Sequence, residues 1–443
     1  MVVFVMKVVH SLTVYLVNFN IFTKRRREMA IVRPFKALRP RKELADKIAS
    51  PPYDVISTEE AKEIAKNNPL SFVRVIRPEV DFDHEVDPHS EEVYRRGRKN
   101  LEEFIQKGYL FQDDKPKFYV YRQTMGNHTQ VGLVACLSCE EYEKGVIKRH
   151  ELTREEKEID RAKHIDLLGA QTGPVFITYR SLEAIDSLIL EGTGGEPEYD
   201  FESDGVRHTF YVIEDEQHIK KIIDAFREIP ALYIADGHHR SAAAARVMHW
   251  RKERNKNHTG EEEYNYFLTV IFPHNHLRIL DYNRVVKDLN GLSKEEFLKK
   301  IQEHFDIEEK GTTGNPYKPE TPHTFGMYLD GKWYKLTAKP TIVDEEDPIK
   351  SLDVSILQEH LLDPVLGIKN PRKDKRIDFV GGIRGLHWLE KLVDEGKFRV
   401  AFSMYPTTME QLLKVADAGL IMPPKSTWFE PKLKSGLAVH LLD

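Results

Sequence analysis

The sequence predicts a fold of the mixed α/β class. Patterns typical of helices and patterns typical of strands alternate along the chain from Ile31 to the C-terminus, and no segment is repeated. The chain has 443 residues, of which 40% are hydrophobic and 31% are charged. This composition is that of a globular protein with a large core, and the length favours more than one domain or lobe.

The first 28 residues do not follow this pattern. An apolar, β-branched stretch comes first, and the positive run KRRR follows it, whereas a signal peptide has its positive charge before the apolar stretch. Lys7, His10 and two asparagines also make the stretch a poor membrane span. A membrane anchor is the alternative; we expect an extra segment, disordered or created by a start-codon error, with Met29 opening the protein.

The expected N-terminal lobe, residues 29–115, contains two helices with a strand between them. Ser57 or Thr58 can cap the first helix, and Pro69 lies beyond its end. The stretch SFVRVIRPE, residues 71–79, is interpreted as a strand. The second helix, residues 93–108, is amphipathic and ends at Gly108.

The expected catalytic core, residues 116–290, begins with a β-hairpin. Its strands are residues 117–125 and 129–142, joined across Gly126 and Asn127. Cys136 and Cys139 fall on the second strand and are expected to pack inside the protein, since a single CxxC pair is not a zinc site. Later in the core we expect helices at 153–170, 215–230 and 242–248, and strands at 173–179, 231–236, 265–273 and 277–286. The expected C-terminal lobe, residues 291–443, starts with a helix and a small β insertion, continues with alternating helices and strands, and completes the site.

Charge and cysteine content restrict the classes of partner. The formal net charge is -5, so no global signature of nucleic-acid binding exists and we expect no nucleic-acid partner. Two cysteines in the whole chain fit a reducing compartment, and we expect a cytoplasmic protein without stable membrane association. Whether the protein is a monomer or a homodimer stays open.

The stretch ALYIADGHHRSAAAARVMHW, residues 231–250, predicts an anion site. An apolar strand leads to Asp236, Gly237 permits a sharp turn, and an alanine-rich helix follows. The first N–H groups of a helix lack partners and attract phosphate groups. His238, His239 and Arg240 add donors at the same place, and Asp236 could hold Mg²⁺ or orient a histidine. The alternative is a capping aspartate with surface histidines.

Two further polar segments are candidates. In residues 147–168, Lys157, Asp160, Arg161 and His164 share one face of the predicted helix, which could equally be a solvated face. Glu151 precedes that helix directly after His150, and its carboxylate could act as a general base toward a hydroxyl.

The segment MPPKSTWFEPK, residues 422–432, is similar to the tail of a phosphate loop. Lys425, Ser426 and Thr427 carry this similarity, but the glycines of a Walker A loop are missing. The segment could line an anion site or be an ordered C-terminal loop.

The motif ADGHHR with its alanine-rich helix resembles the phosphate-binding motif of the ParB/sulfiredoxin superfamily, and most of all that of the free L-serine kinases. The chain from Ile31 onward also resembles DUF1015, a family of unknown function. The motifs that carry this second resemblance are RPFKALRP (33–40), SPPYDVIS (50–57), NPLSFVRVIRPE (68–79), KRHELT (148–153), ADGHHR (235–240) and MPPKSTWFEPKLKSGL (422–437).

These resemblances imply a ParB/sulfiredoxin-like core with N- and C-terminal elaborations. They imply a kinase that transfers a phosphoryl group from pyrophosphate, ADP or ATP to the hydroxyl of free L-serine, with Mg²⁺ as cofactor. A phosphoserine phosphatase or phosphotransferase and a ParB-like nucleotide-binding switch are the alternatives. The switch would require a helix-turn-helix segment and a basic surface, which the sequence does not show.

The resemblance also implies a role for each candidate residue. The catalytic residues would be Glu151, Asp236 and His239, with Glu151 as base and Asp236 on Mg²⁺. Glu151 lies farther from Asp236 in the sequence than the base does in the small kinases, which an insertion would explain. Donor phosphates would be bound by Gly237, His238, Arg240, Arg161, Lys425, Ser426 and Thr427, and Arg161 and Lys425 could instead hold the substrate carboxylate. Substrate would be bound by Tyr53, Asp54 and His150.

Overall fold

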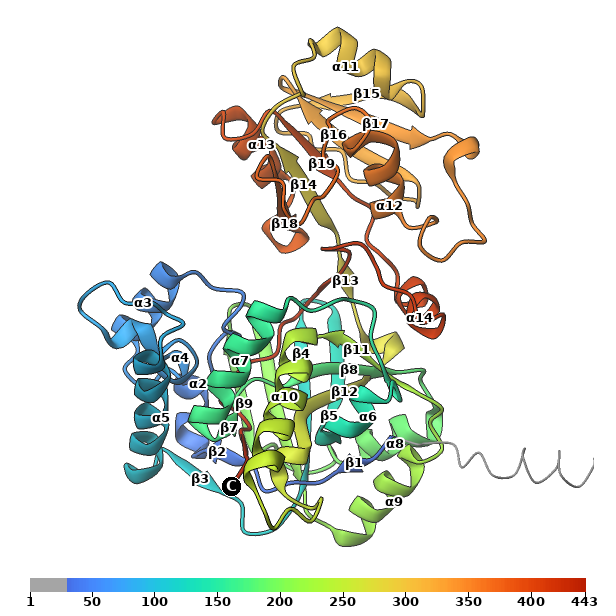
Figure 1. Cartoon of the computed structure of the whole chain (residues 1–443). Helices are drawn as coiled ribbons and strands as arrows, with labels where there is room; N and C mark the ends of the chain where they lie inside the picture. Colours follow the sequence, from blue (N-terminus) through green and yellow to red (C-terminus); the bar gives the residue numbers. More distant parts are fainter. Residues whose placement is uncertain (1–29) are drawn as a thin grey trace, which may run out of the picture.

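The computed structural model describes residues 30–443, which form two lobes joined by a narrow connection (Figure 1). Helices and strands alternate in both lobes, so the predicted mixed α/β class is confirmed. The extra segment expected at residues 1–28 and the expected start at Met29 concern residues outside the described part of the chain. The division of the chain at residues 115 and 290 stays a prediction.

The larger lobe is built on a nine-stranded mixed sheet with the order β6–β11–β8–β12–β5–β4–β10–β9, and β1 also pairs with β5. Its strands are β1 (Val32–Arg33), β4 (Phe118–Met125), β5 (His128–Ser138), β6 (Ile147–Lys148), β8 (Val175–Tyr179), β9 (Tyr199–Ser203), β10 (Val206–Ile213), β11 (Leu232–Asp236) and β12 (Tyr266–Pro273). Strand β11 runs parallel to β6, with Tyr233 opposite Lys148. The chain therefore leaves β6 and β11 at the same edge of the sheet.

Helix α10 (His238–Arg254) packs on this sheet through small side chains. Its residues Ala242–Ala245, Val247 and Met248 are buried in one cluster with side chains of β8 and β11. Helix α7 (Glu155–Leu168) packs against α10, and α5 (Glu91–Gln106) packs against α7. Alanine allows such close approach, because its side chain adds little volume between the helix and the sheet. The other helices of this part are α6 (Cys139–Glu143), α8 (Glu183–Glu191) and α9 (Glu216–Phe226).

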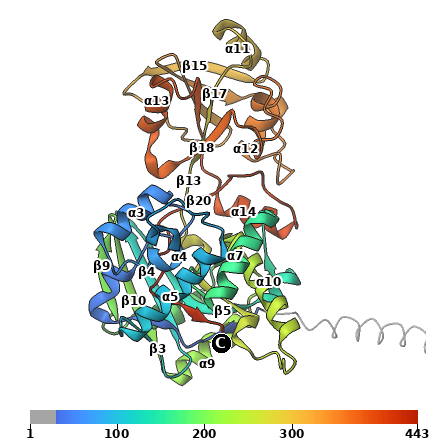
Figure 2. The ribbon, with the colours of Figure 1, turned by 60° about the vertical axis from the view of Figure 1, so that its left-hand side comes forward.

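The N-terminal segment adds a helical layer beside α7. Helix α4 (Val73–Ile76) lies next to α5, and α3 (Thr58–Asn67) lies next to α4 (Figure 2). Shorter elements complete the segment: β2 (Leu38–Pro40), which pairs with β3 (Leu110–Gln112), and α2 (Ala45–Ile48). Within residues 30–443, none of the helices has both the length and the apolar character needed to cross a bilayer.

The smaller lobe is built on a six-stranded sheet with the order β15–β17–β16–β19–β14–β18. Its strands are β14 (Tyr282–Val286), β15 (Phe305–Thr312), β16 (Thr324–Leu329), β17 (Lys332–Ala338), β18 (Ile377–Gly381) and β19 (Val400–Ser403). Its helices are α11 (Lys294–Ile301), α12 (Asp353–Leu357) and α13 (Leu386–Asp394). The core of this lobe includes Trp333, whose indole N–H donates to the buried Glu390 carboxylate at 2.8 Å.

Two antiparallel strands connect the lobes. Strand β13 (Ile279–Leu280) leads into the smaller lobe, and β20 (Trp428–Phe429) pairs with it on the way back. Helix α14 (Met409–Asp417) lies between the lobes, where Asp417 accepts hydrogen bonds from Lys148, Tyr233 and Arg180. The chain ends in the larger lobe, where β21 (His440–Leu441) pairs with β7 (Ala170–Gln171). Residues 422–432 consequently lie at the junction of the lobes.

Several predicted elements are confirmed. Ser57 caps α3 in a capping box with Glu60. Strands β4 and β5 form the predicted hairpin, with Met125 opposite His128. Cys136 and Cys139 are both buried and free, as expected for packing residues.

The strand predicted at residues 71–79 is wrong. Residues 73–76 form α4, and a 3₁₀ turn follows at Pro78–Asp81. Phe72, Val73 and Val75 are fully buried, in clusters that include side chains of α3 and α5. The β-strand preference of these residues is therefore overridden by packing in a helical layer.

Two further boundaries differ from the prediction. The strand predicted to reach residue 142 ends at Ser138, whose hydroxyl accepts from the Glu141 N–H and so starts α6. The strand predicted at 277–286 is divided into β13 and β14 at Asp281, whose carbonyl accepts from the Gly382 N–H at 2.7 Å. Both interruptions come from local hydrogen bonds that periodicity does not reveal.

Candidate active site

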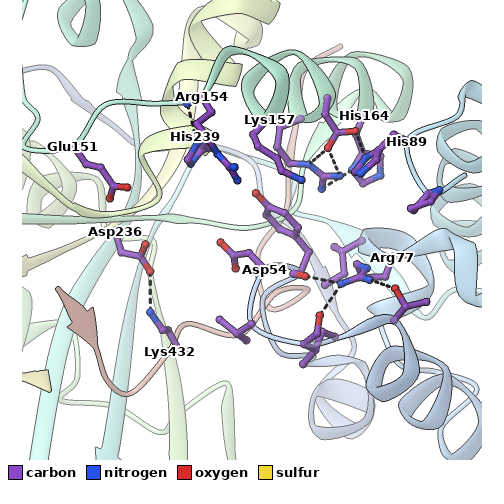
Figure 3. Close-up of a pocket in the computed structure, with 18 of the residues that line it drawn as sticks. Asp54, Arg77, His89, Glu151, Arg154, Lys157, His164, Asp236, His239 and Lys432 are labelled. Carbon is purple, nitrogen blue, oxygen red and sulfur yellow. Dashed lines mark hydrogen bonds and ion pairs between the residues drawn. The ribbon is translucent and has the colours of Figure 1, made fainter. Parts of the chain in front are cut away.

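One cavity of about 610 Å³ lies where α10, α7, the N-terminal segment and the returning C-terminal segment meet (Figure 3). It brings together most of the predicted site residues from four distant parts of the sequence. The predicted residues that line it are Tyr53, Asp54, Glu151, Arg161, Asp236, His239, Lys425, Ser426 and Thr427.

The turn between β11 and α10 has the predicted strand–turn–helix form. Gly237 has a φ of 100° and precedes the first residue of α10. A Cβ at this position would lie 3.1 Å from Cζ of Arg240, so a side chain would be both strained and crowded. No side chain caps α10, and the N–H groups of His238 and His239 donate to no group within residues 30–443. The turn therefore offers free donors at the positive end of a long helix.

Asp236 ends β11 and lines the cavity. Its Oδ2 accepts a hydrogen bond from Lys432 Nζ at 3.1 Å, and Arg240 Nη2 lies 3.7 Å away. Burial opposes the charge of this carboxylate, but Lys432 and Arg240 together hold its pKa below the ordinary value. Asp236 is accordingly a charged group at neutral pH.

Glu151 reaches the same cavity because β6 lies beside β11 in the sheet. The chain leaves β6 at Lys148, and the N–H of Met422 donates to the His150 carbonyl at 2.8 Å. Burial, followed by the charge of Asp236, raises the pKa of Glu151, while Lys425 acts in the opposite direction. A carboxylate with a raised pKa is a stronger proton acceptor than an exposed one.

His238 lies beside Glu151, behind the cavity wall. Its Nδ1 lies 3.9 Å from Glu151 Oε2, and its Nε2 accepts from the His150 N–H at 3.5 Å. The rings of His150 and His238 meet edge to face at 4.5 Å. Burial lowers the pKa of both histidines, that of His150 to about 4. Both rings are thus neutral near pH 7.

Three predicted ligand-binding side chains do not line the cavity. His150 and His238 are buried behind Glu151, and Arg240 lies below Gly237 with its guanidinium donating to the Pro174 carbonyl. The sequence places these polar groups close to the predicted turn. It does not reveal which of their side chains point into the cavity. Gly237 has no side chain and contributes through its backbone, which forms the turn before α10.

His239 is the histidine of the motif that faces the cavity. Its Nε2 accepts a hydrogen bond from the Arg154 N–H at 3.2 Å. Burial, and then the charge of Arg154, lowers the pKa of His239. A neutral ring whose Nε2 accepts must have its proton on Nδ1, so His239 presents an N–H donor.

Arg161 is already engaged. Its Nε and Nη2 donate to Asp160 Oδ2 at 3.2 and 3.1 Å, and its guanidinium lies 4.2 Å from the centre of the Tyr53 ring. Asp160 also accepts hydrogen bonds from His89, at 2.7 Å, and from Tyr94. Arg161 was predicted to bind a donor phosphate or the substrate carboxylate. In the structure, its guanidinium is engaged in holding Tyr53 against α7. Burial raises the pKa of Tyr53 to about 12, so this side chain stays a phenol.

Arg77, to which the sequence analysis gave no role, fixes the loop that carries Asp54. It donates to Glu79 at 2.6 Å, to the carbonyls of Tyr53 and Ile56 at 3.0 and 2.7 Å, and to the Thr58 hydroxyl at 2.8 Å. Asp54 projects from this loop into the cavity and has no ion pair within residues 30–443 (Figure 3). The motif SPPYDVIS is thus held by an arginine of the motif NPLSFVRVIRPE.

The C-terminal segment supplies lysines from the junction of the lobes. Lys425 Nζ lies 5.4 Å from the centre of the Tyr282 ring. Burial opposes its charge, but Tyr282, Glu151 and Asp54 together raise its pKa. Ser426 is less available, because its hydroxyl donates to the Pro423 carbonyl at 2.7 Å. Lys432, the partner of Asp236, is not among the residues predicted from the sequence.

A family model described as a protein of unknown function (DUF1015) matches residues 32–355. The chain belongs to the DUF1015 family. No curated protein matches this DUF1015 protein.

Three solved structures show weak similarity to this DUF1015 protein. A conserved hypothetical protein from Pyrococcus furiosus is 14% identical, with a TM-score of 0.34, over 70% of this chain and 95% of its own. A mutant free serine kinase in complex with AMP is 13% identical, with a TM-score of 0.35, over 69% and 91%. SbnI with a C-terminal truncation, from Staphylococcus aureus, is 11% identical, with a TM-score of 0.38, over 70% and 87%. Similarity this low assigns no activity to the DUF1015 protein.

Within residues 30–443, no group of three or more His, Cys, Asp or Glu side chains is arranged to hold a metal ion. Mg²⁺ does not need such a group, because it retains waters and is usually bound by one or two carboxylates together with substrate phosphates. Both contacts of Asp236 go to Oδ2, and the carboxylates of Asp54 and Glu151 line the same cavity. This donor set of the DUF1015 protein fits Mg²⁺ that arrives with phosphate.

Proposed function

We propose that this protein is a phosphotransferase that phosphorylates the hydroxyl of free L-serine to give O-phospho-L-serine. The donor is pyrophosphate or a nucleotide, ADP or ATP. One observation carries the proposal. Glu151 faces the uncapped start of α10 and Asp236 across a single cavity, which Lys425 and Lys432 also line. The resemblance of ADGHHR to the motif of the free L-serine kinases supports serine as the acceptor.

Glu151 acts as the general base for the serine hydroxyl. The oxygen of that hydroxyl forms a new bond to phosphorus, the bond from phosphorus to the leaving phosphate oxygen breaks, and Glu151 takes the proton. The leaving group is orthophosphate from pyrophosphate, AMP from ADP or ADP from ATP. The raised pKa of Glu151 improves the proton transfer.

The donor phosphates bind at the start of α10. The free N–H groups of His238 and His239, the Nδ1–H of His239 and the ammonium of Lys425 are the donors available there. Phosphoryl transfer needs alignment and charge neutralisation more than covalent catalysis, and these groups supply hydrogen-bond donors and positive charge for that purpose. Lys432 orients Asp236 through its hydrogen bond.

Asp236 would hold Mg²⁺ together with waters and oxygens of the donor phosphates. Bound there, the ion would neutralise charge on the donor phosphates. Asp54 binds the ammonium group of serine, and Tyr53 forms the wall beside it.

The test is a comparison of Glu151→Gln with Glu155→Gln, an exposed glutamate in the first turn of α7. Phosphoserine formation is expected to fall by about a hundredfold or more in Glu151→Gln, since general base catalysis is typically worth that much. Glu155→Gln is expected to keep the wild-type rate. A fall below about threefold in Glu151→Gln would contradict the role of Glu151 as base.

A further inference from the structure

Most charged side chains that line the cavity already have a partner of opposite charge. These ion pairs are Arg77–Glu79, Arg154–Glu156, Arg161–Asp160 and Lys432–Asp236. In the described part of the chain, the lining residues Asp54, Lys157 and Lys425 have no ion pair. Those three charges are therefore free to meet a ligand.

The two lysines lie on different sides of the cavity. The charge of Lys425 acts on Glu151, and its ammonium lies over Tyr282 at the junction of the lobes, where phosphoryl transfer is proposed. Lys157 projects from the first turn of α7, between His239 and His164, away from Asp236 and Glu151 (Figure 3). Asp54 lies between these two regions.

Lys157 also lines a second hollow beside the cavity. A neighbouring groove of about 370 Å³ shares Lys157, Asp160, His89 and Tyr94 with the cavity wall. Asp160 is saturated by its partners and holds Arg161, and Arg154 pairs with Glu156. Among the described residues, Lys157 is thus the lining cation on this side without an ion pair.

We propose that Lys157 binds the carboxylate of the acceptor and thereby selects a free amino acid over other hydroxyl compounds. This inference rests on the proposed function. An amino acid has an ammonium and a carboxylate on one carbon, and Asp54 and Lys157 are complementary to this pair of charges. With both held, the side-chain hydroxyl is directed toward Glu151. Ammonium-to-carboxylate hydrogen bonds are strong enough to decide such selection.

The experiment compares L-serine with L-serinamide, which keeps the hydroxyl and ammonium but lacks the carboxylate. Wild type, Lys157→Met and Lys163→Met are assayed with each acceptor, and the KM of the donor is measured in parallel. Lys163 is a matched control, because it is an exposed lysine of α7 that lines the groove but not the cavity. Thermal unfolding checks that each variant is folded.

The expected result is a fall in kcat/KM for L-serine of at least about tenfold in Lys157→Met, the usual effect of losing a hydrogen bond to a charged group. The value for L-serinamide should change by less than about twofold, and Lys163→Met should match wild type. An equal fall for both acceptors, or a rise in the KM of the donor alone, would overturn the assignment.

A binding measurement separates this inference from the proposed function. Calorimetry with L-serine and L-serinamide needs no turnover. If wild type binds L-serine more tightly than L-serinamide, and Lys157→Met does not, Lys157 binds the carboxylate even where no phosphoserine is formed. Binding without this difference would refute the role of Lys157 and leave the kinase proposal standing.

Discussion

Replacement of Arg77 by methionine is expected to destabilise the protein strongly, because Arg77 is half of a largely buried ion pair. The Arg77 side chain is 16% exposed and that of Glu79 is 6% exposed, so the pair is largely removed from water. Arg77 also holds the carbonyls of Tyr53 and Ile56. Removing one partner of a buried pair leaves the other charge uncompensated, which typically costs about 3–5 kcal/mol.

Urea unfolding is the assay, with Arg98→Met as the control. Arg98 pairs with Glu102, but their side chains are 54% and 51% exposed, and such surface pairs contribute about 0–1 kcal/mol. The double variant Arg77→Met/Glu79→Met should recover part of the loss, because no buried carboxylate is then left unpaired. A cost below about 1 kcal/mol for Arg77→Met, or no recovery in the double variant, would refute this reasoning. The acceptor KM should also rise, since the loop that carries Asp54 is no longer fixed.

Three further predictions follow from the cavity. Gly237→Ala should lower the free energy of unfolding by about 1–2 kcal/mol, because alanine is strained at a φ of 100°, and the thermal midpoint measures it. The acid limb of the pH–rate profile should have its midpoint above the ordinary glutamate value of 4.5, since Glu151 must be ionised and its pKa is raised; a midpoint below 4.5 would contradict this. Because the folded state holds the Glu151 proton more tightly than the unfolded state does, Glu151 lowers stability as pH rises through its raised pKa. Glu151→Gln should therefore be more stable than wild type at pH 7 and equally stable near pH 3, as thermal unfolding at both pH values would show.

Local signals in the sequence predict the parts of the fold that depend on neighbouring residues. The capping box of α3, the β4–β5 hairpin and the turn at Gly237 all depend on residues within a few positions of each other. The helix at residues 73–76 could not be predicted in this way. The conformation of its β-branched residues is determined by packing against helices that are distant in the sequence.

The candidate site depends on the order of strands, which the sequence does not reveal. Glu151 approaches Asp236 because β6 pairs with β11, and Lys432 arrives only when the chain returns from the smaller lobe. Motifs identified the segments, but the inward or outward direction of each side chain depends on packing. This is why His238 and Arg161 are supporting groups, whereas Lys432 and Arg77 had no assigned role.

The most direct test of the account is phosphoserine formation from L-serine and Mg²⁺, with pyrophosphate, ADP and ATP offered separately. The account predicts O-phospho-L-serine with at least one donor and its loss in Glu151→Gln. If wild type forms no phosphoserine with any of the three donors, the proposed function is wrong. Release of phosphate from phosphoserine by the same protein would then identify a phosphatase.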